Sequence, residues 1–207
     1  MVARLRLPSN SLLGITSAMP RRACETRRRI VESAYQLFYR EGFQRAGVDA
    51  VAETAGVTKR TLYNHFPSKD ALIAEVLEAQ ADLAGAEIRR WCGQDSATPE
   101  ELVGGIFAGL RRWARTPGWH GSGFTRAAME LAWAPGHPAR WAAAAQKQSV
   151  EQMLTEALAG SGAASPARLA RELVLLIEGA SVLRLIHGDE AWFDAAEAAA
   201  LALARGR

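Results

Sequence analysis

The chain of 207 residues is 49% hydrophobic and 23% charged, a composition that supports a packed core in one large domain or two small ones. No stretch approaches the roughly 18 consecutive apolar residues of a membrane-spanning helix, so no membrane partner is predicted. The two cysteines, Cys24 and Cys92, lie in different predicted helices without metal-ligand spacing, which excludes a disulfide framework, predicts no metal site and suits a reducing cytoplasm.

Charge is distributed unevenly along the chain. Residues 21–70 hold ten Lys and Arg against six Asp and Glu, whereas residues 71–207 hold thirteen against sixteen. A basic N-terminal quarter on a mildly acidic remainder predicts a polyanion partner for that quarter alone. A solvated basic surface without a partner is the alternative.

Residues 1–20 do not join the periodic patterns that follow. "SLLGI" is too short for the apolar region of a signal peptide, and arginines follow it at once. We interpret this stretch as a disordered N-terminal arm, or as an extension before a true start at Met19. An arm that touches DNA is a third possibility.

The first predicted helix covers residues 21–41. Ile30, Ala34, Leu37 and Phe38 are spaced as one helical face, and Gly42 provides a C-terminal stop. The next residue, a phenylalanine, is placed to fold back onto the helix.

Two short predicted helices, at residues 48–55 and 59–65, flank one glycine and indicate a helix-turn-helix. In this motif the first helix braces the second, which enters a major groove roughly 12 Å wide. Ala52 is small where the two helices would cross, and Gly56 can adopt the left-handed conformation of the turn. The predicted core and turn residues are Val48, Val51, Ala52, Ala55, Gly56, Val57 and Leu62.

The polar residues outside this small core predict a DNA contact surface. The first turn of the second helix places side chains at base edges, and later positions suit phosphate oxygens. The start of the next helix adds N–H groups and a dipole that favour an anion. The alternatives are solvated charges on a structural hairpin, a packing role for the tyrosine and a core or capping role for the histidine. The predicted DNA-binding residues are Thr58, Lys59, Arg60, Thr61, Tyr63, Asn64, His65 and Lys69.

Helices are predicted for the rest of the chain. A long one begins near Ser68, which can cap it, and is followed by helices at about 99–115, 124–133, 139–158, 166–187 and 190–204. Thr98 begins a capping box, and Ser165 is the predicted cap before Pro166. The chain is therefore predicted to be all-α, with about nine helices.

The stretch "GVTKRTLYNHFPSKDAL" resembles the signature of the TetR family of bacterial transcriptional regulators. The preceding "LFYREGF" and the later helices fit the same layout, and the resemblance is specific over about residues 27–77. It implies an N-terminal three-helix DNA-binding domain, here residues 21–67, followed by a helical ligand-binding and dimerisation domain, residues 68–207. It further implies a homodimer on a palindromic operator, usually a repressor, whose two DNA-binding heads move apart when a small ligand binds.

Two positions depart from the family pattern. Family members often carry Ser or Thr where this chain has Ala46 and Gly47, so a hydroxyl cap and its phosphate contact are predicted to be missing. Some relatives carry a basic DNA-contacting group at Asp49, whereas an aspartate is predicted to stabilise the N-terminus of its own helix. The helix at residues 48–55 is therefore not among the predicted contacts.

Four of the six tryptophans fall between residues 113 and 141, among breaks at Pro-Gly pairs. Such a cluster predicts a cavity for an apolar or aromatic effector, with Glu130 as a partner for a cationic one. The alternative is that these rings belong to the core. The predicted ligand-binding residues are Phe107, Trp113, Trp119, Phe124, Met129, Glu130, Trp133 and Trp141.

The last two predicted helices are apolar on most sides, which predicts burial on most sides and a homodimer interface of four helices. The alternative is that they cover the core of their own domain. The predicted interface residues are Leu169, Leu173, Leu176, Ala180, Leu183, Trp192, Ala196, Ala199 and Leu203.

Together these patterns predict a sequence-specific DNA-binding transcriptional regulator, most readily a repressor released from a palindromic operator by a small molecule. It would be cytoplasmic, associated with the nucleoid when bound, and would need no cofactor. Control by a protein partner or by cysteine oxidation is the main alternative. An enzyme that uses the tryptophan cavity is disfavoured, because no G-x-S-x-G motif, paired metal ligands or adjacent Cys and His are present.

Overall fold

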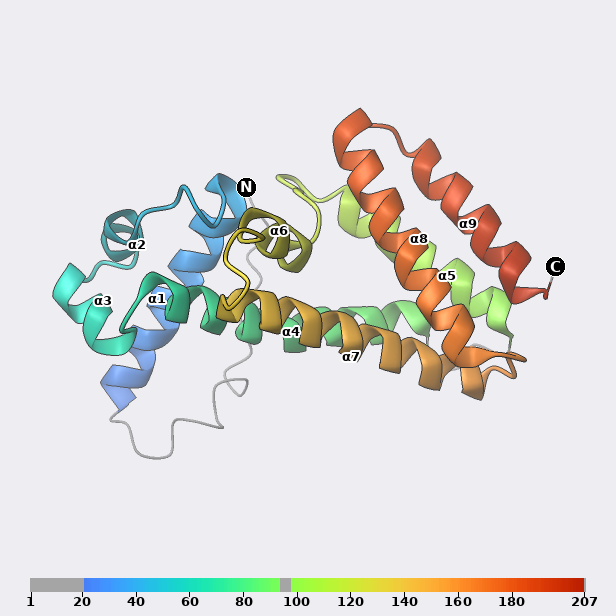
Figure 1. The fold of residues 1–207 in the computed structure, drawn as a ribbon, viewed down its shortest axis with the longest axis horizontal. Coiled ribbons are helices and arrows are strands. Elements are labelled where there is room, and N and C mark those ends of the chain that lie inside the picture. The colour runs from blue at the N-terminus through green and yellow to red at the C-terminus, as the bar shows by residue number, and fades with distance from the viewer. Residues whose placement is uncertain (1–20, 94–97, 207) are drawn as a thin grey trace. The chain divides into compact units, whose positions relative to one another are not determined.

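The computed structural model describes residues 21–93 and 98–206, where every regular element is a helix (Figure 1). The predicted all-α fold is confirmed, and the predicted N-terminal arm lies outside the described residues. No helix in the described ranges has the length and apolarity that crossing a membrane requires. The nine helices of the described chain are α1 (Arg21–Glu41), α2 (Val48–Thr54), α3 (Lys59–His65), α4 (Lys69–Cys92), α5 (Pro99–Ala114), α6 (Gly123–Glu130), α7 (Pro138–Gly160), α8 (Pro166–His187) and α9 (Ala191–Ala204).

The described residues form two compact units. The N-terminal unit comprises residues 21–83 and 122–144, and the C-terminal unit comprises the described parts of 84–121 and 145–206. Helices α4 and α7 each begin in the N-terminal unit and end in the C-terminal unit. The sequence predicts a division after residue 67, whereas the structure groups α6 with the helix-turn-helix.

The end of α1 follows the predicted stop signal. Gly42 has a φ of 104°, and its N–H donates to the carbonyl of Phe38 at 2.9 Å. The ring of Phe43 then lies 5.6 Å from that of Phe38. This return of the chain fixes where the loop towards α2 begins.

The core of the N-terminal unit is formed by α1, the helix-turn-helix and the first half of α4. Helices α1 and α2 pack together, as do α2 and α3. An ion pair of 2.8 Å joins Arg27 of α1 to Glu75 of α4, and the same guanidinium lies 4.4 Å from the ring centre of Phe66. The largest fully buried side chains of this unit are Ile30, Phe38, Leu62, Phe66, Leu72 and Ile73.

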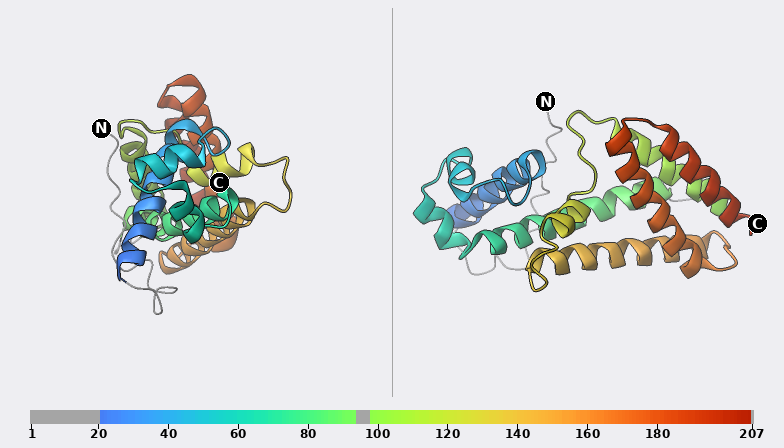
Figure 2. Two further views of the ribbon diagram at one scale, coloured as in Figure 1. Left: turned by 90° about the vertical axis from the view of Figure 1, so that its left-hand side faces the viewer. Right: turned by 45° about the horizontal axis from the view of Figure 1, so that its top comes forward.

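In the C-terminal unit, α8 and α9 lie side by side, as Figures 1 and 2 both show, and α9 also packs on α5. Arg111 of α5 bridges two carboxylates of α9, Asp194 at 2.6 Å and Glu197 at 2.7 Å. Phe107, Leu154 and Phe193 are completely buried. These contacts make one continuous core from the C-terminal helices.

The helix ends of this unit confirm one capping prediction and correct another. Thr98 and Glu101 form the predicted capping box at the start of α5. The side chain of Ser165 makes no capping hydrogen bond, so α8 begins at Pro166 without the predicted serine cap. Gly188, with a φ of 71°, ends α8 as predicted.

Candidate nucleic-acid interface

The turn between α2 and α3 has the geometry that a helix-turn-helix requires. Gly56 has a φ of 63°, the left-handed conformation that favours glycine. The N–H of Val57 donates to the carbonyl of Ala52 at 2.9 Å and closes the turn. The predicted residues Val51, Ala52, Ala55 and Leu62 are buried, whereas Val48 and Val57 are half-buried and Gly56 is exposed.

The first turn of α3 is held by two threonines. The hydroxyl of Thr58 accepts the N–H of Thr61 at 3.1 Å and so caps the helix. The two hydroxyl oxygens are 2.9 Å apart. Both predicted contact residues are therefore ordered before any partner arrives, which lowers the entropic cost of using them.

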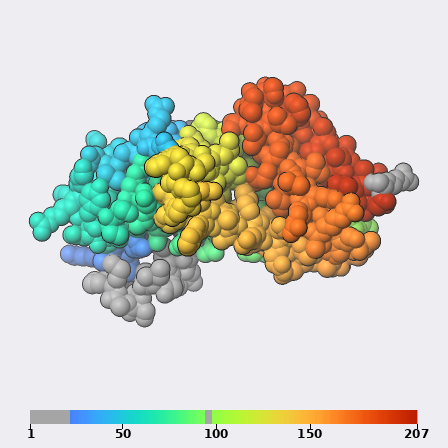
Figure 3. Space-filling view, in the orientation of Figure 1, coloured from blue at the N-terminus to red at the C-terminus, as the bar shows by residue number. Residues whose placement is uncertain are grey.

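The outer face of α3 carries exposed polar and aromatic side chains. Lys59, Arg60 and Asn64 are exposed, and Tyr63 retains 41% of its accessible surface. Figure 3 shows the α2–α3 segment at the surface of the molecule, coloured cyan to teal. Leu62 is the buried residue of α3, and these four exposed positions are available to a partner.

An ion pair joins the first turns of α2 and α3. The ammonium of Lys59 lies 2.8 Å from one carboxylate oxygen of Asp49 and 3.1 Å from the other. This hydrogen bond and the negative charge raise the pKa of Lys59 above its usual value. Gly47 precedes α2 without a side-chain cap. The carboxylate of Asp49 is thus engaged by the neighbouring helix as well as lying in the first turn of its own.

Two predicted phosphate contacts lie in a different environment from the exposed face of α3. His65 is half-buried, and burial followed by the positive charge of Arg27 lowers its pKa. Lys69 donates to the carbonyl of Gln44 at 2.8 Å, and burial lowers its pKa despite nearby carboxylates. Their ability to bind phosphate stays a prediction.

The structure places Gln44 and Arg126, which the sequence does not indicate as functional, around the predicted residue Glu130. The N–H of Gln44 donates to Glu130 at 3.0 Å, and its side-chain amide donates to the carbonyl of the same residue. Arg126 pairs with Glu130 at 2.6 Å and donates to the carbonyl of Tyr39 at 2.7 Å. Helix α6 therefore holds the loop between α1 and α2, which positions α2.

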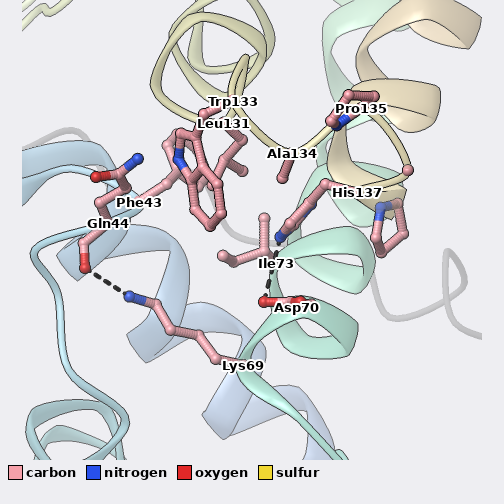
Figure 4. Close-up of a pocket in the computed structure, with 12 residues that line it drawn as sticks. Phe43, Gln44, Lys69, Asp70, Ile73, Leu131, Trp133, Ala134, Pro135 and His137 are labelled. Carbon is pink, nitrogen blue, oxygen red and sulfur yellow. Dashed lines mark hydrogen bonds and ion pairs between the residues drawn. The ribbon is translucent and has the colours of Figure 1, made fainter.

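A pocket of about 640 Å³ lies beside this loop (Figure 4). Its lining comes from the loop after α1, the start of α4, and the segment from the end of α6 to the first residue of α7. Trp133 lines it, whereas none of the other predicted ligand-binding residues does. The lining residues are Phe43, Gln44, Lys69, Asp70, Ile73, Leu131, Trp133, Ala134, Pro135, Gly136, His137 and Pro138.

The predicted ligand-binding set is divided between the units. In the C-terminal unit, Phe107 and Trp119 are buried, and Trp113 packs edge-on to Trp119 at 5.5 Å between ring centres. In the N-terminal unit, Phe124 is buried and Glu130 is paired as described. An enclosed cavity would bury the side chains that line it. Three of the predicted residues are instead largely exposed: Met129 at 67%, Trp133 at 73% and Trp141 at 71%.

The nine predicted dimer residues differ in exposure, and four of them are buried. Leu169, Leu173, Ala180 and Ala196 are buried within their own unit, and Leu176, Leu183 and Leu203 are half-buried. A side chain already buried in its own chain has little surface left for a partner, and the role of the whole set in a dimer interface stays a prediction. Trp192 and Ala199 are exposed. The exposed apolar positions of α8 include Leu175, Gly179, Leu185 and Ile186.

Residues 30–76 match the family model of bacterial regulatory proteins of the tetR family. A solved structure of a TetR-family transcriptional regulator from Streptomyces coelicolor is 28% identical, with a TM-score of 0.78 over 88% of this chain and 96% of that one. A second, described as a tetR transcriptional regulator from Streptomyces avermitilis MA-4680, is 30% identical, with a TM-score of 0.69 over 83% of this chain and 98% of that one. The chain belongs to the TetR family.

Curated TetR-family relatives match over the N-terminal region. The regulator UidR of Escherichia coli K12 is 35% identical over 71 residues, which are 34% of this chain and 36% of UidR. This chain thus covers about a third of the length of that relative. The likeness is strongest where the TetR helix-turn-helix lies, and full-length similarity comes from the solved structures.

Proposed function

We propose that this TetR-family protein is a sequence-specific DNA-binding transcriptional regulator, a repressor that a small molecule releases from a palindromic operator. It would act in the cytoplasm, associated with the nucleoid when bound. The observation that carries the proposal is the exposed polar face of α3, presented by a closed helix-turn-helix. The sequence similarity of residues 30–76 to tetR-family regulators supports the same role.

The roles of the α3 residues follow from their chemistry. Arg60 carries a planar guanidinium suited to guanine, and Asn64 carries an amide suited to adenine, so both are the proposed base-reading residues. Thr58 and Thr61, ordered by their mutual contact, are proposed to hold phosphate oxygens at the groove wall. Tyr63 extends this surface with an exposed ring and hydroxyl.

A homodimer would bring two such surfaces to one operator. We propose that the outward faces of α8 and α9 form its interface, because Leu175 is 69% exposed, Ile186 is 65% exposed and Trp192 also lies at the surface. Large apolar side chains gathered on two adjacent helices are typical of a protein interface. A two-fold dimer would space the recognition helices by about one DNA turn, ~34–36 Å, or a multiple of it.

Effector control needs a link between a ligand and α2–α3. The contacts of Gln44 with Glu130 and Lys69 provide one, because they hold the loop that leads into α2. An effector that prefers the form unable to bind DNA by ~3 kcal/mol would shift operator binding by about 150-fold. We propose an apolar or aromatic effector.

Oxidation of Cys92 is disfavoured as the control mechanism. The thiol is buried, and burial raises its pKa to about 11. Because the thiolate is the reactive form, a thiol with this pKa is almost wholly unreactive at neutral pH.

The proposal is tested by Arg60→Ala on an operator selected from random duplex DNA. Loss of a base-reading guanidinium is expected to weaken specific binding by roughly 1–3 kcal/mol, about 5- to 150-fold. Arg112→Ala is the matched control, since it removes an exposed arginine from α5 in the other unit. Fluorescence anisotropy with labelled operator measures both, and equal affinity of the two variants would contradict the role given to Arg60.

A further inference from the structure

The pocket beside the loop after α1 contains an ammonium, that of Lys69, which forms no ion pair with the described residues. Lys69 donates to the neutral carbonyl of Gln44, and its ammonium lies 5.9 Å from the ring centre of Phe38. The carboxylates of Asp70 and Glu130 act on its charge through space without forming an ion pair with it among the described residues. Asp70 is the one acidic side chain in the lining, and its carboxylate oxygen lies 3.2 Å from Nε2 of His137. Lys69 is therefore the charged group that remains for an occupant.

His137, which directly precedes α7, lies beside the carboxylate of Asp70. The Nδ1 atom of His137 accepts the N–H of Ala139 at 3.1 Å, so the other nitrogen, Nε2, carries a proton. This buried Nε2 makes no well-aligned hydrogen bond with the described residues, although an Asp70 oxygen lies 3.2 Å from it. The contact holds the Asp70 carboxylate beside His137, and the N-terminal dipole of α4 adds positive potential at Lys69.

Apart from Gln44, the remaining lining is apolar, and it contains an exposed tryptophan. Figure 4 shows Trp133 and Leu131 opposite Lys69 and Asp70, with Ile73 between them. Phe43 and Ile73 are buried, whereas Trp133 is 73% exposed. A volume of about 640 Å³ is in the range of sites for small organic molecules. An exposed indole beside an apolar floor would bury its surface if a flat apolar group lay between them.

We propose that this pocket binds a small aromatic carboxylate. Its carboxylate pairs with the ammonium of Lys69 in place of the Gln44 carbonyl, and its ring packs between Trp133 and Ile73. An ammonium–carboxylate hydrogen bond is stronger than one to a neutral carbonyl, so the exchange is favourable. The site lies within the N-terminal unit and does not involve the Trp113–Trp119 cluster of the other unit.

Occupation of the site acts on the helix-turn-helix through Gln44. Both the carbonyl and the N–H of this residue hold the loop before α2, the first through Lys69 and the second through Glu130. Removing the Lys69 contact leaves α6 as the remaining polar anchor of Gln44, and the loop gains freedom. The bound carboxylate therefore lowers affinity for DNA, a consequence that rests on the proposed function.

The binding test uses three probes with one skeleton: 3-phenylpropionate, 3-phenylpropylamine and 3-phenylpropanol. Quenching of tryptophan fluorescence in the full chain, without DNA, is expected to show the carboxylate binding at least about tenfold more tightly than the amine or the alcohol. Equal binding of the three probes, or no binding of the carboxylate at millimolar concentration, overturns the proposal.

Variants place the binding site. Lys69→Gln and Trp133→Ala are each expected to weaken 3-phenylpropionate binding about tenfold. Trp141→Ala is the matched control, because Trp141 is 71% exposed in the same unit but does not line the pocket. Calorimetric titration reads binding without relying on the altered fluorophore. Unchanged affinity in the Lys69 and Trp133 variants, or an equal loss in the control, contradicts this site.

The effect on DNA is measured separately with a labelled duplex at saturating 3-phenylpropionate. A reduction of DNA affinity of at least about threefold in the wild type, absent in Trp133→Ala, is the expected result. Probe binding without this reduction overturns the link through Gln44. A wild-type chain that binds the probe but no DNA at all refutes the proposed function and leaves the pocket assignment standing.

Discussion

At the scale of single residues, the ion pair between Asp49 and Lys59 is expected to lower the non-specific DNA affinity of the α2–α3 surface. The two side chains are more than half exposed, and the carboxylate contacts the ammonium at 2.8 Å. A lysine that already has a counter-charge releases few counterions when it meets a phosphate. Asp49 therefore reduces the sequence-independent part of binding, which is the part that depends most on salt.

Asp49→Asn is expected to strengthen binding to random duplex DNA and to steepen its dependence on salt. One additional phosphate contact per subunit changes the slope of log K against log salt by about 0.9. Glu53→Gln is the control, since it removes an exposed carboxylate from the same helix. The effect should vanish in a Lys59→Gln background, and its persistence there would mean that Asp49 acts by direct repulsion of DNA.

His65 gives the stability of the protein a pH dependence. Burial and the charge of Arg27 lower its pKa in the folded state, so below about pH 6.5 the unfolded chain binds more protons. Its contribution is complete above that pH and is lost as the pH falls through the lowered pKa. The decrease in Tm from pH 7.5 to 5.5 should be smaller in His65→Gln than in the wild type. An equal decrease would show that other groups cause it.

Residue identity predicted part of the site and missed another part. The exposure of Lys59, Arg60 and Asn64 follows from their polarity on a short helix whose apolar positions are few. The partner of Lys69 could not be predicted, because a backbone carbonyl 25 positions away leaves no mark on the sequence. Asp49 illustrates the same limit, since its contact with α3 depends on the angle between two helices.

At the scale of elements, the glycines of α5 form a groove for Trp91. A Cβ at Gly109 would lie 2.2 Å from the indole of Trp91, and one at Gly105 would lie 2.4 Å from its carbonyl oxygen. A Cβ at Gly104 would meet nothing within 4 Å. The end of α4 can therefore approach α5 closely only because Gly105 and Gly109, which face Trp91, have no side chain.

Gly109→Ala is expected to destabilise the protein by about 1–3 kcal/mol, because the rigid indole must move within a packed core. Gly104→Ala is the matched change in the same helix, and its better helix propensity should stabilise the fold by about 0.5–1 kcal/mol. Chemical denaturation of both variants measures the difference. If both substitutions changed the free energy of unfolding in the same direction, contact with Trp91 would not explain why residue 109 is a glycine.

Helix positions were predictable because apolar spacing and end signals agree. Gly42, the Thr98 capping box and Gly188 mark three helix ends correctly. Ser165 shows the limit of such signals, since its side chain can cap only if its backbone takes the required conformation. The orientation of α8 was also beyond the pattern, because apolar residues surround it and do not indicate which stripe faces inward.

At the scale of the whole molecule, the association of α6 with the helix-turn-helix is the feature that the sequence could not show. It depends on Gln44 and Glu130, which are 86 positions apart. Nothing in the sequence around either residue indicates that the two are in contact. The closeness of four tryptophans in the sequence did not predict a single site, because they belong to two different units.

The proposed dimer is tested with Leu175→Glu. A carboxylate on the outward face of α8 should convert the dimer to a monomer, because it would be buried without a partner at the interface. Met129→Glu is the control, as Met129 is similarly exposed in the N-terminal unit. Light scattering gives the mass of each. A dimer that survives Leu175→Glu would place the interface elsewhere.

Selection of DNA by the purified full-length protein tests the central claim most directly. Random duplex DNA is bound, recovered and sequenced over several rounds, with the folded state confirmed by circular dichroism. Two copies of one half-site in inverted repeat, with centres one or more helical turns apart, are the predicted result. Salt-sensitive binding without any sequence preference would contradict the claim that α3 reads an operator.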